Sequence, residues 1–481
     1  MISNHNILMR NPSQISFVGI SIILLIALAW WTFSKPKVNV IISEPGMDNR
    51  EDKAGGLNEI INIGEFFESF LSSTTTFEES WPRFRGSDFD NIKKGGIDLI
   101  DQFESGNPKI KWNVDLGEGH AGPAVYKGLV YIMDYDEQQK ADMLRCFTLK
   151  DGKEVWRRWY NVNIKRNHGM SRTIPAVTEK FILTIGPRSH VMCLERETGN
   201  LLWGIDIEKE YETQIPFWYT GQCPLIDDGK AIIATGGNAL MIAIDCATGE
   251  RIWEISNDHG LKMSHASIIP WQYGGRKMYV YSAVGGVVGI AADGDDVGSI
   301  LWKSLKWGCS VVAPSPVCLP DGKIFLTAGY GAGSMVFQVS EKDGIFSIEK
   351  LYEYKPKDGL ACEQQTPVVY DGLVYGIIPK DGGALRNQFV CVNPTDFRKV
   401  IWSSGKTNRF GLGPYMIADD KFWVLNDDGM LSIVKPAKTA FTLLDQIKVF
   451  EAHDAWAPLA IADGNLLLRD DHTMVCMDIK K

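Results

Sequence analysis

The stretch "CLERETGNLLWG", Cys193 to Gly204, is written almost a second time in "AIDCATGERIWE", Ala243 to Glu254. Both place a tryptophan four residues after a glycine, within residues that favour β-strands. The tryptophans with this spacing lie 47, 50 and 49 residues apart; the pairs are Gly152 and Trp156, Gly199 and Trp203, Gly249 and Trp253, and Gly298 and Trp302. A fixed period of this length predicts a repeat protein.

An apolar run opened by proline or a small residue precedes each tryptophan, and the pattern continues in weaker form to the C-terminus. Eight units result, beginning near Gly122, Ile174, Cys223, Ser267, Ser315, Thr366, Gly413 and Ala457. Each unit alternates like four short strands separated by turns. Four strands repeated about every 47 residues predict an all-β, eight-bladed β-propeller of four-stranded blades.

The two ends of the repeat region are complementary. The last unit stops after three strands, at "HTMVCMDIKK", whereas "PKIKWNVDLG", Pro108 to Gly117, stands before the first unit with nothing of its own to complete. We therefore expect the strand around Trp112 to pair with the last three strands and close the ring, which removes the unpaired edges. The tryptophans predicted to dock between blades are Trp112, Trp156, Trp203, Trp253, Trp302 and Trp402.

The N-terminal segment has the composition of a membrane span. From Ile15 to Phe33 no charge occurs, and a helix of that length would nearly match the hydrocarbon layer of about 30 Å. It predicts one N-terminal transmembrane helix, either a retained anchor or a signal peptide cut after the small residues of "ALA", 27–29. Trp30 and Trp31, followed by Lys35, favour an anchor. The body would then lie in the periplasm or another extracytoplasmic space.

The predicted domains are a membrane anchor or signal segment at 1–33, a tether at 34–80 and the propeller at 81–481. Within the tether, "LNEIINIGEFFESFL", Leu57 to Leu71, has apolar residues at helical spacing and predicts a short amphipathic helix. Packing on the body of the protein is favoured over binding a partner.

The repeats carry a resemblance to a known family. The motifs "ETGNLLW" and "ATGERIW", with "WPRFRG" at Trp81 to Gly86, resemble the bacterial pyrroloquinoline-quinone (PQQ)-binding-like β-propeller repeat proteins over residues 81–481. The resemblance implies an eight-bladed ring and one of two roles. The first is a quinoprotein dehydrogenase, which holds PQQ and a calcium ion near the axis. The second is a non-catalytic scaffold like the lipoprotein of the outer-membrane barrel-assembly machine.

The cysteines favour the non-catalytic branch. The chain has nine cysteines but neither an adjacent pair nor a C-x-x-C motif, so the dehydrogenase signatures do not transfer. Cysteines at the third-strand position of different units are expected to serve as small apolar residues, too far apart for disulfides or metal binding; they are Cys146, Cys193, Cys391 and Cys476. No cofactor, catalytic residue or metal site is predicted, and PQQ with calcium belongs to the alternative.

Polar and aromatic residues gather in the segments before the innermost strands, which converge on one mouth of the channel. The candidate ligand-binding residues there are His120, His168, Arg172, Tyr219, His265, Gln364, Arg409 and Trp456. Together they could form a pocket for an anionic or aromatic ligand, including a quinone. The competing interpretation is that a water-filled channel has a polar lining in any case.

The net charge of −9 argues against a nucleic-acid partner. The sequence thus predicts a membrane-tethered, extracytoplasmic propeller that binds other envelope or membrane proteins through its loops. The alternative is a PQQ-dependent alcohol or sugar dehydrogenase that uses the channel mouth.

Overall fold

The computed structural model describes residues 21–30, 60–70, 75–104 and 107–481. The chain divides into two units, Met1–Asp52 and Lys53–Lys481. In the first unit, residues 21–30 are helical and exposed. Among the described residues, no helix has the length and apolar character needed to cross a membrane. Nine of the 19 residues of the predicted span, 15–20 and 31–33, lie outside the described residues, and the span stays a prediction.

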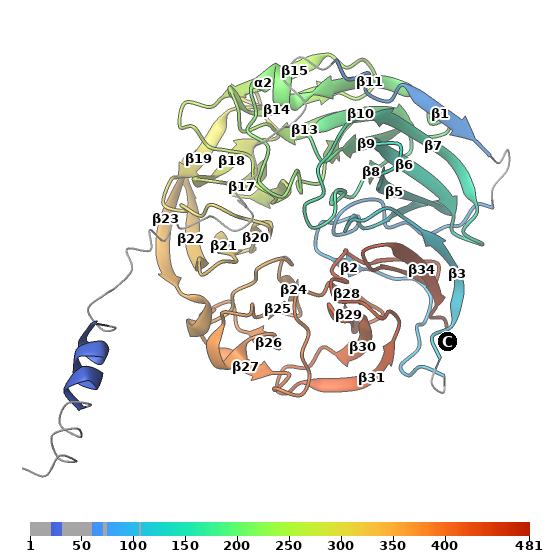
Figure 1. Ribbon diagram of the computed structural model, residues 1–481. Helices are drawn as coiled ribbons and strands as arrows, with labels where there is room; N and C mark the ends of the chain where they lie inside the picture. Colours follow the sequence, from blue (N-terminus) through green and yellow to red (C-terminus); the bar gives the residue numbers. More distant parts are fainter. Residues whose placement is uncertain (1–20, 31–59, 71–74, 105–106) are drawn as a thin grey trace, which may run out of the picture. The chain divides into compact units, whose positions relative to one another are not determined.

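In the described part of the second unit, the strands form eight sheets arranged in a ring (Figure 1). Blade 1 consists of β4 (Ala124–Tyr126), β5 (Leu129–Asp136), β6 (Ala141–Thr148) and β7 (Glu154–Asn161), and blade 2 consists of β8 (Ala176–Val177), β9 (Phe181–Ile185), β10 (His190–Glu195) and β11 (Leu201–Asp206). Blade 3 consists of β12 (Leu225–Asp227), β13 (Lys230–Ala234), β14 (Ala239–Asp245) and β15 (Arg251–Ser256). Blade 4 consists of β16 (Ile269–Tyr273), β17 (Arg276–Ala283), β18 (Gly286–Ala291) and β19 (Ile300–Ser304).

Blade 5 consists of β20 (Val317–Cys318), β21 (Lys323–Ala328), β22 (Gly333–Lys342) and β23 (Ile345–Tyr354), and blade 6 consists of β24 (Val368–Tyr370), β25 (Leu373–Ile377), β26 (Phe389–Val392) and β27 (Val400–Ser403). Blade 7 consists of β28 (Tyr415–Ala418), β29 (Lys421–Leu425), β30 (Met430–Lys435) and β31 (Thr442–Lys448). Blade 8 has three strands of its own, β32 (Ala460–Ala462), β33 (Asn465–Arg469) and β34 (Thr473–Asp478). Short helical turns lie in the connections: α2 (Ile207–Tyr211), η1 (Pro356–Asp358) and η2 (Gly383–Leu385). The predicted eight-bladed ring is confirmed.

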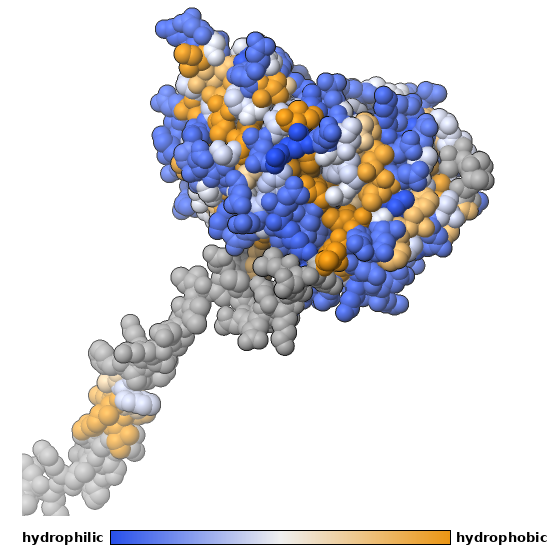
Figure 2. Space-filling view, turned by 90° about the horizontal axis from the view of Figure 1, so that it is seen from above, coloured by the Kyte–Doolittle hydropathy of each residue, from blue (hydrophilic) through white to orange (hydrophobic). Residues whose placement is uncertain are grey.

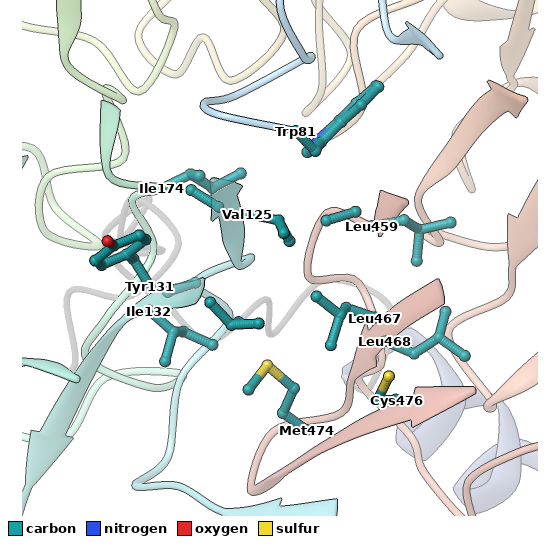
Figure 3. Close-up of a cluster of buried hydrophobic side chains, with 14 of the residues drawn as sticks. Trp81, Val125, Tyr131, Ile132, Ile174, Leu459, Leu467, Leu468, Met474 and Cys476 are labelled. Atoms are coloured by element: carbon teal, nitrogen blue, oxygen red, sulfur yellow. The ribbon is translucent and has the colours of Figure 1, made fainter. Parts of the chain in front are cut away.

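The ring closes as predicted. Strand β3 (Ile110–Asp115) pairs antiparallel with β34, with Trp112 opposite Cys476, and completes the sheet of blade 8. Figure 3 shows the joint between the two ends of the ring, where Val125 and Ile132 of blade 1 face Leu467 of blade 8 across a buried apolar cluster. The last blade is therefore held by strands from both ends of the repeat region.

The repeated glycine lies against the tryptophan of the preceding blade. A Cβ atom added to Gly152 would lie 2.6 Å from the indole ring of Trp112, and one added to Gly249 would lie 2.9 Å from that of Trp203. Both glycines have positive φ, 68° and 76°, which other residues adopt only with strain. The indole N–H groups donate to backbone carbonyl groups of the next blade. Trp112 donates to the Leu149 carbonyl at 3.0 Å, and Trp203 donates to the Cys246 carbonyl at 3.0 Å. The repeat thus encodes a contact between neighbouring blades.

Trp302 departs from this arrangement. Its indole N–H points to the Met278 sulfur, 3.2 Å away in the same blade, and its ring takes the space that a side chain at Gly289 would need. The corresponding turn of blade 5, at Gly344, has no atom near the place of a Cβ. Without a turn to receive it, the ring packs inward.

A second set of contacts links the blades near the axis, just before the innermost strands. The backbone N–H of each residue in a series donates to the side chain at the equivalent position of the next blade. The series runs from Ile174 to the Cys223 sulfur (3.3 Å), Cys223 to the Ser267 hydroxyl (3.0 Å), Ser267 to the Ser315 hydroxyl (3.0 Å) and Ser315 to the Thr366 hydroxyl (2.8 Å). We call this series the inner belt.

Residues 79–93, which we call the plug segment, cross the end of the channel away from the mouth. Trp81 exchanges two backbone hydrogen bonds with Val125 of β4, each 2.8 Å. Strand β2 (Ile92–Lys93) pairs in parallel with β28 on the inner side of the ring (Figure 1). The side chain of Glu79 accepts from the Asp463 N–H, in the turn that ends β32. Such turns lie opposite the loops that open the innermost strands, so the segment covers that end.

Arg85 anchors the middle of the plug segment. Its guanidinium donates to the carbonyl groups of Thr366 (3.1 Å) and Pro367 (3.3 Å) at the start of β24. Burial lowers the pKa of Arg85 to about 10, so the group remains charged near neutral pH. Its hydrogen bonds therefore compensate for its burial.

The predicted amphipathic helix is not formed by the described residues 60–70. Instead β1 (Phe66–Ser69) pairs antiparallel with β7 and adds a fifth strand to blade 1. Phe66 stacks on Trp159, with ring centroids 5.5 Å apart. Gly64, at a φ of 70°, turns the chain before this strand. The helix prediction was wrong because it used only the spacing of apolar residues. That spacing does not show that the open edge of β7 provides backbone hydrogen-bond partners for this segment.

The face of the ring seen in the space-filling view is largely polar. Figure 2 shows hydrophilic residues over most of the face in view, with hydrophobic residues between them. The large apolar side chains that remain exposed include Leu202, Ile252 and Ile401, each next to a repeat tryptophan on an outermost strand.

The contact between glycine and tryptophan can be tested by paired substitutions. Gly152→Ala and Gly229→Ala place a methyl group at nearly equal φ, 68° and 72°, but only Gly152 faces an indole ring. We expect Gly152→Ala to cost about 1–3 kcal/mol more in unfolding free energy, because it overpacks the joint. Denaturant titration measures the difference. Equal losses in the two variants would contradict the contact.

The inner belt predicts a loss on removing one hydroxyl. Ser267→Ala leaves the Cys223 N–H buried without its acceptor and should lower the unfolding free energy by about 1–3 kcal/mol. The exposed Ser347→Ala is the control and should change it by less than about 0.5 kcal/mol. Urea unfolding followed by tryptophan fluorescence checks both, and a neutral Ser267→Ala would show that the belt does not contribute.

Candidate binding site

Arg172 lies at the centre of the channel mouth, in the loop between β7 and β8. Its Nε donates to the Trp218 carbonyl at 2.6 Å, and one terminal nitrogen donates to the carbonyl groups of Asn167 and His168 at 2.9 and 2.7 Å. Its guanidinium also lies over the ring of Trp456, 5.5 Å from the centroid. Burial lowers the pKa of Arg172 to about 10, so it still carries a positive charge near pH 7.

Two imidazoles, the buried His120 and the half-buried His265, flank this cation. The ring of His120 stacks on Trp456, with centroids 3.6 Å apart and planes 18° apart. Burial first, and then the charge of Arg172, lowers the pKa of His265 to about 3, and the same two causes lower the pKa of His120. Both histidines are therefore neutral near pH 7, because a second cation beside Arg172 is disfavoured.

A row of aromatic rings leads from this centre to the surface. Trp218 stacks on Tyr330, with centroids 5.4 Å apart, and meets Phe217 edge to face at 5.3 Å. The ammonium group of Lys380 lies 6.0 Å from the Tyr330 centroid. We call Phe217, Trp218, Tyr330 and Lys380 the aromatic row. Phe217 and Tyr330 are exposed by 37% and 47%.

The structure brings most of the predicted mouth residues together, but not all of them. His120, Arg172, Trp456 and His265 form the centre, and the His168 carbonyl joins it through Arg172. The Tyr219 hydroxyl donates to the Lys165 carbonyl beside them. Gln364 lines a small cavity with Glu363 and Gly411.

Arg409 has a different setting. Its guanidinium pairs with Asp427 and Asp428 and lines a separate cavity of about 260 Å³ with Arg386 and Lys406. Its carboxylate partners hold its pKa above the ordinary value. Arg409 was predicted to line the central pocket, but its charge is neutralised by Asp427 and Asp428 beside the separate cavity.

Sequence reasoning missed Tyr330, Lys380 and the plug segment. Tyr330 has a φ of 56° and sits between two glycines in "AGYGAG", a pattern that could have marked a strained, exposed aromatic side chain. Lys380 carries no comparable signal. The motif "WPRFRG" was noted in the plug segment, but the sequence did not indicate that this segment crosses the channel.

The mouth residues do not fit PQQ with calcium. Among the described residues, no group of three or more His, Cys, Asp or Glu side chains is arranged to hold a metal ion. The contact between His120 and Trp456 leaves no gap between those rings for a planar ligand. The cavity beside Glu363 measures about 10 Å³, which is room for about one water molecule.

The neutral histidine at the centre predicts acid sensitivity. Because folding lowers the pKa of His265 from 6.5 to about 3, the unfolded chain binds the extra proton between these values. The stabilisation is complete above about pH 6.5 and is lost as the pH falls toward 3. We expect the urea midpoint of His265→Gln to fall less between pH 7 and 4.5 than that of the native chain. The exposed His453→Gln replacement is the control, and parallel curves for the native chain and His265→Gln would contradict the assignment.

Comparison with known proteins gives one family match and several similar structures. Residues 139–304 match the family described as "Outer membrane protein assembly factor BamB". A curated quinohemoprotein alcohol dehydrogenase from Comamonas testosteroni is 25% identical over 139 residues, 27% of this chain. That match spans only 18% of the relative's length.

The similar solved structures include both kinds of protein. BamB from Moraxella catarrhalis has a TM-score of 0.51 at 11% identity, covering 77% of this chain and all of that one. A europium-containing methanol dehydrogenase has a TM-score of 0.56 at 12% identity, covering 83% and 89%. The quinohemoprotein alcohol dehydrogenase ADHIIG from Pseudomonas putida HK5 has a TM-score of 0.52 at 12% identity, covering 83% and 80%. At these identities the likenesses show the fold alone. Together with the match over residues 139–304, they confirm that the chain resembles the PQQ-like β-propeller repeat proteins, as predicted from the sequence.

Proposed function

We propose that this protein is a membrane-tethered, extracytoplasmic scaffold that binds another envelope or membrane protein at its channel mouth. The aromatic row is the observation that carries the proposal. Exposed aromatic side chains beside a cation are typical of residues that dominate binding at protein interfaces. Tyr330 is exposed and its ring is stacked on Trp218, which offers a fixed contact at little further entropic cost.

The architecture supports a surface role for the mouth. The plug segment covers the opposite end of the channel, and the centre of the mouth is occupied by stacked rings and by a guanidinium bound to backbone carbonyl groups. A partner would therefore contact the loops and the aromatic row rather than enter the channel. The match to the assembly-factor family over residues 139–304 agrees with this role.

Tethering is the second part of the proposal. Residues 15–33 have the apolar length of a membrane span, and export of the chain that follows would place the ring outside the cytoplasm. The partners expected there are other envelope or membrane proteins.

Photocrosslinking tests the proposed surface. We replace Phe217 or Tyr330 with a photoreactive phenylalanine analogue in the full chain, in the cell that produces it. Both positions should yield a covalent adduct with the same partner, identified by mass spectrometry. The control position is Ile345, which is 74% exposed at the start of β23 and away from the mouth loops in sequence. The proposal would be contradicted if neither Phe217 nor Tyr330 gave an adduct, or if Ile345 gave the same adduct as they do.

A PQQ-dependent alcohol or sugar dehydrogenase is the second candidate, favoured by the fold shared with the methanol dehydrogenase. The purified chain with added PQQ and calcium chloride should show no dye-linked alcohol oxidation if the scaffold proposal holds. Oxidation that His265→Ala abolishes would establish the dehydrogenase instead.

A further inference from the structure

Two cysteines of neighbouring blades meet at one of the tryptophan contacts. Cys193 lies in β10 of blade 2, and Cys246 follows β14 of blade 3. The Cys193 thiol donates to the Cys246 carbonyl at 3.3 Å, and the same carbonyl accepts the Trp203 indole N–H at 3.0 Å. The side chain of Cys246 is also near enough to raise the pKa of the Cys193 thiol. Both side chains are completely buried.

We propose that Cys193 and Cys246 form a disulfide bond that ties blade 2 to blade 3. The third-strand cysteines were expected to be too far apart to bridge, and that expectation considered only equivalent positions. Cys246 occupies a different position, in the turn that receives the tryptophan of blade 2. The structure places this turn against the third strand, so a pair arises that alignment of the repeats does not show.

The bond would form by thiol–disulfide exchange with a small or protein disulfide as oxidant. The thiolate of one cysteine attacks a sulfur of the oxidant, whose S–S bond breaks and releases one thiolate. The second cysteine then attacks the mixed disulfide and releases the other. One S–S bond forms in the protein, the oxidant is reduced to two thiols, and these take up the two protons lost by the cysteines.

The bond should form while the ring folds rather than afterwards. In the folded chain, the neighbouring Cys246 and then burial hold the pKa of Cys193 far above its ordinary value, so little reactive thiolate is present. Complete burial also keeps an oxidant out. Before blades 2 and 3 meet, both thiols are accessible.

Refolding of the full chain in detergent tests the proposal. Denatured, reduced protein is refolded with a mixture of reduced and oxidised glutathione, its free thiols are blocked with iodoacetamide, and it is digested with trypsin. We expect peptides 189–196 and 231–251, which each hold one of the cysteines, to be joined by a disulfide. Two of the nine cysteines should escape alkylation.

Matched variants separate this pair from the other cysteines. Cys193→Ser should abolish the joined peptides, whereas Cys391→Ser, at the same strand position in blade 6, should retain them. Oxidised refolding should raise the Tm of the native chain and of Cys391→Ser but not of Cys193→Ser. Alkylation of both cysteines after oxidative refolding, or a bridge from Cys193 to another cysteine, would overturn the proposal. These readouts do not depend on the proposed scaffold role.

Discussion

The ring depends on the joints between neighbouring blades, because a single four-stranded sheet cannot bury both of its faces. Two contacts meet at these joints. Near the rim, a flat indole ring lies on the glycine of the next turn, where any side chain would collide with it. Near the axis, each backbone N–H of the inner belt donates a hydrogen bond to a hydroxyl or thiol of the next blade. The first contact supplies apolar area and the second satisfies buried donors, so the two act on different terms of the folding free energy.

The sequence revealed the ring because the rim contact is written in it at a constant period. The glycine and the tryptophan four residues later are both visible without coordinates. Their period predicted the number of units, and the unpaired strand around Trp112 predicted the closure. What escaped prediction depends on partners far away in sequence. The strand at Phe66 follows from an open edge on β7 that apolar spacing cannot show. Trp302 breaks the pattern because blade 5 lacks a turn that could receive its ring.

The candidate site was predicted in its centre and not in its periphery. His120, Arg172, His265 and Trp456 occupy equivalent loops, so the period alone was enough to bring them together. Arg409 occupies an equivalent loop as well, but its guanidinium pairs with Asp427 and Asp428. Tyr330 and Lys380 have no such periodic signal. A repeat therefore fixes which loops converge, while local ion pairs decide which side chains face the shared space.

The plug segment links the beginning of the ring to its end. Glu79 bonds to Asp463, 384 positions later, and Arg85 bonds to Thr366, 281 positions later. These two bonds cannot form until blades 6 and 8 have been synthesised, although Trp81 can pair with Val125 of blade 1 earlier. Contacts so distant in sequence carry a large entropic cost of closure and slow the last step of folding. During that interval the end of the channel that the plug segment covers in the complete ring is not yet closed.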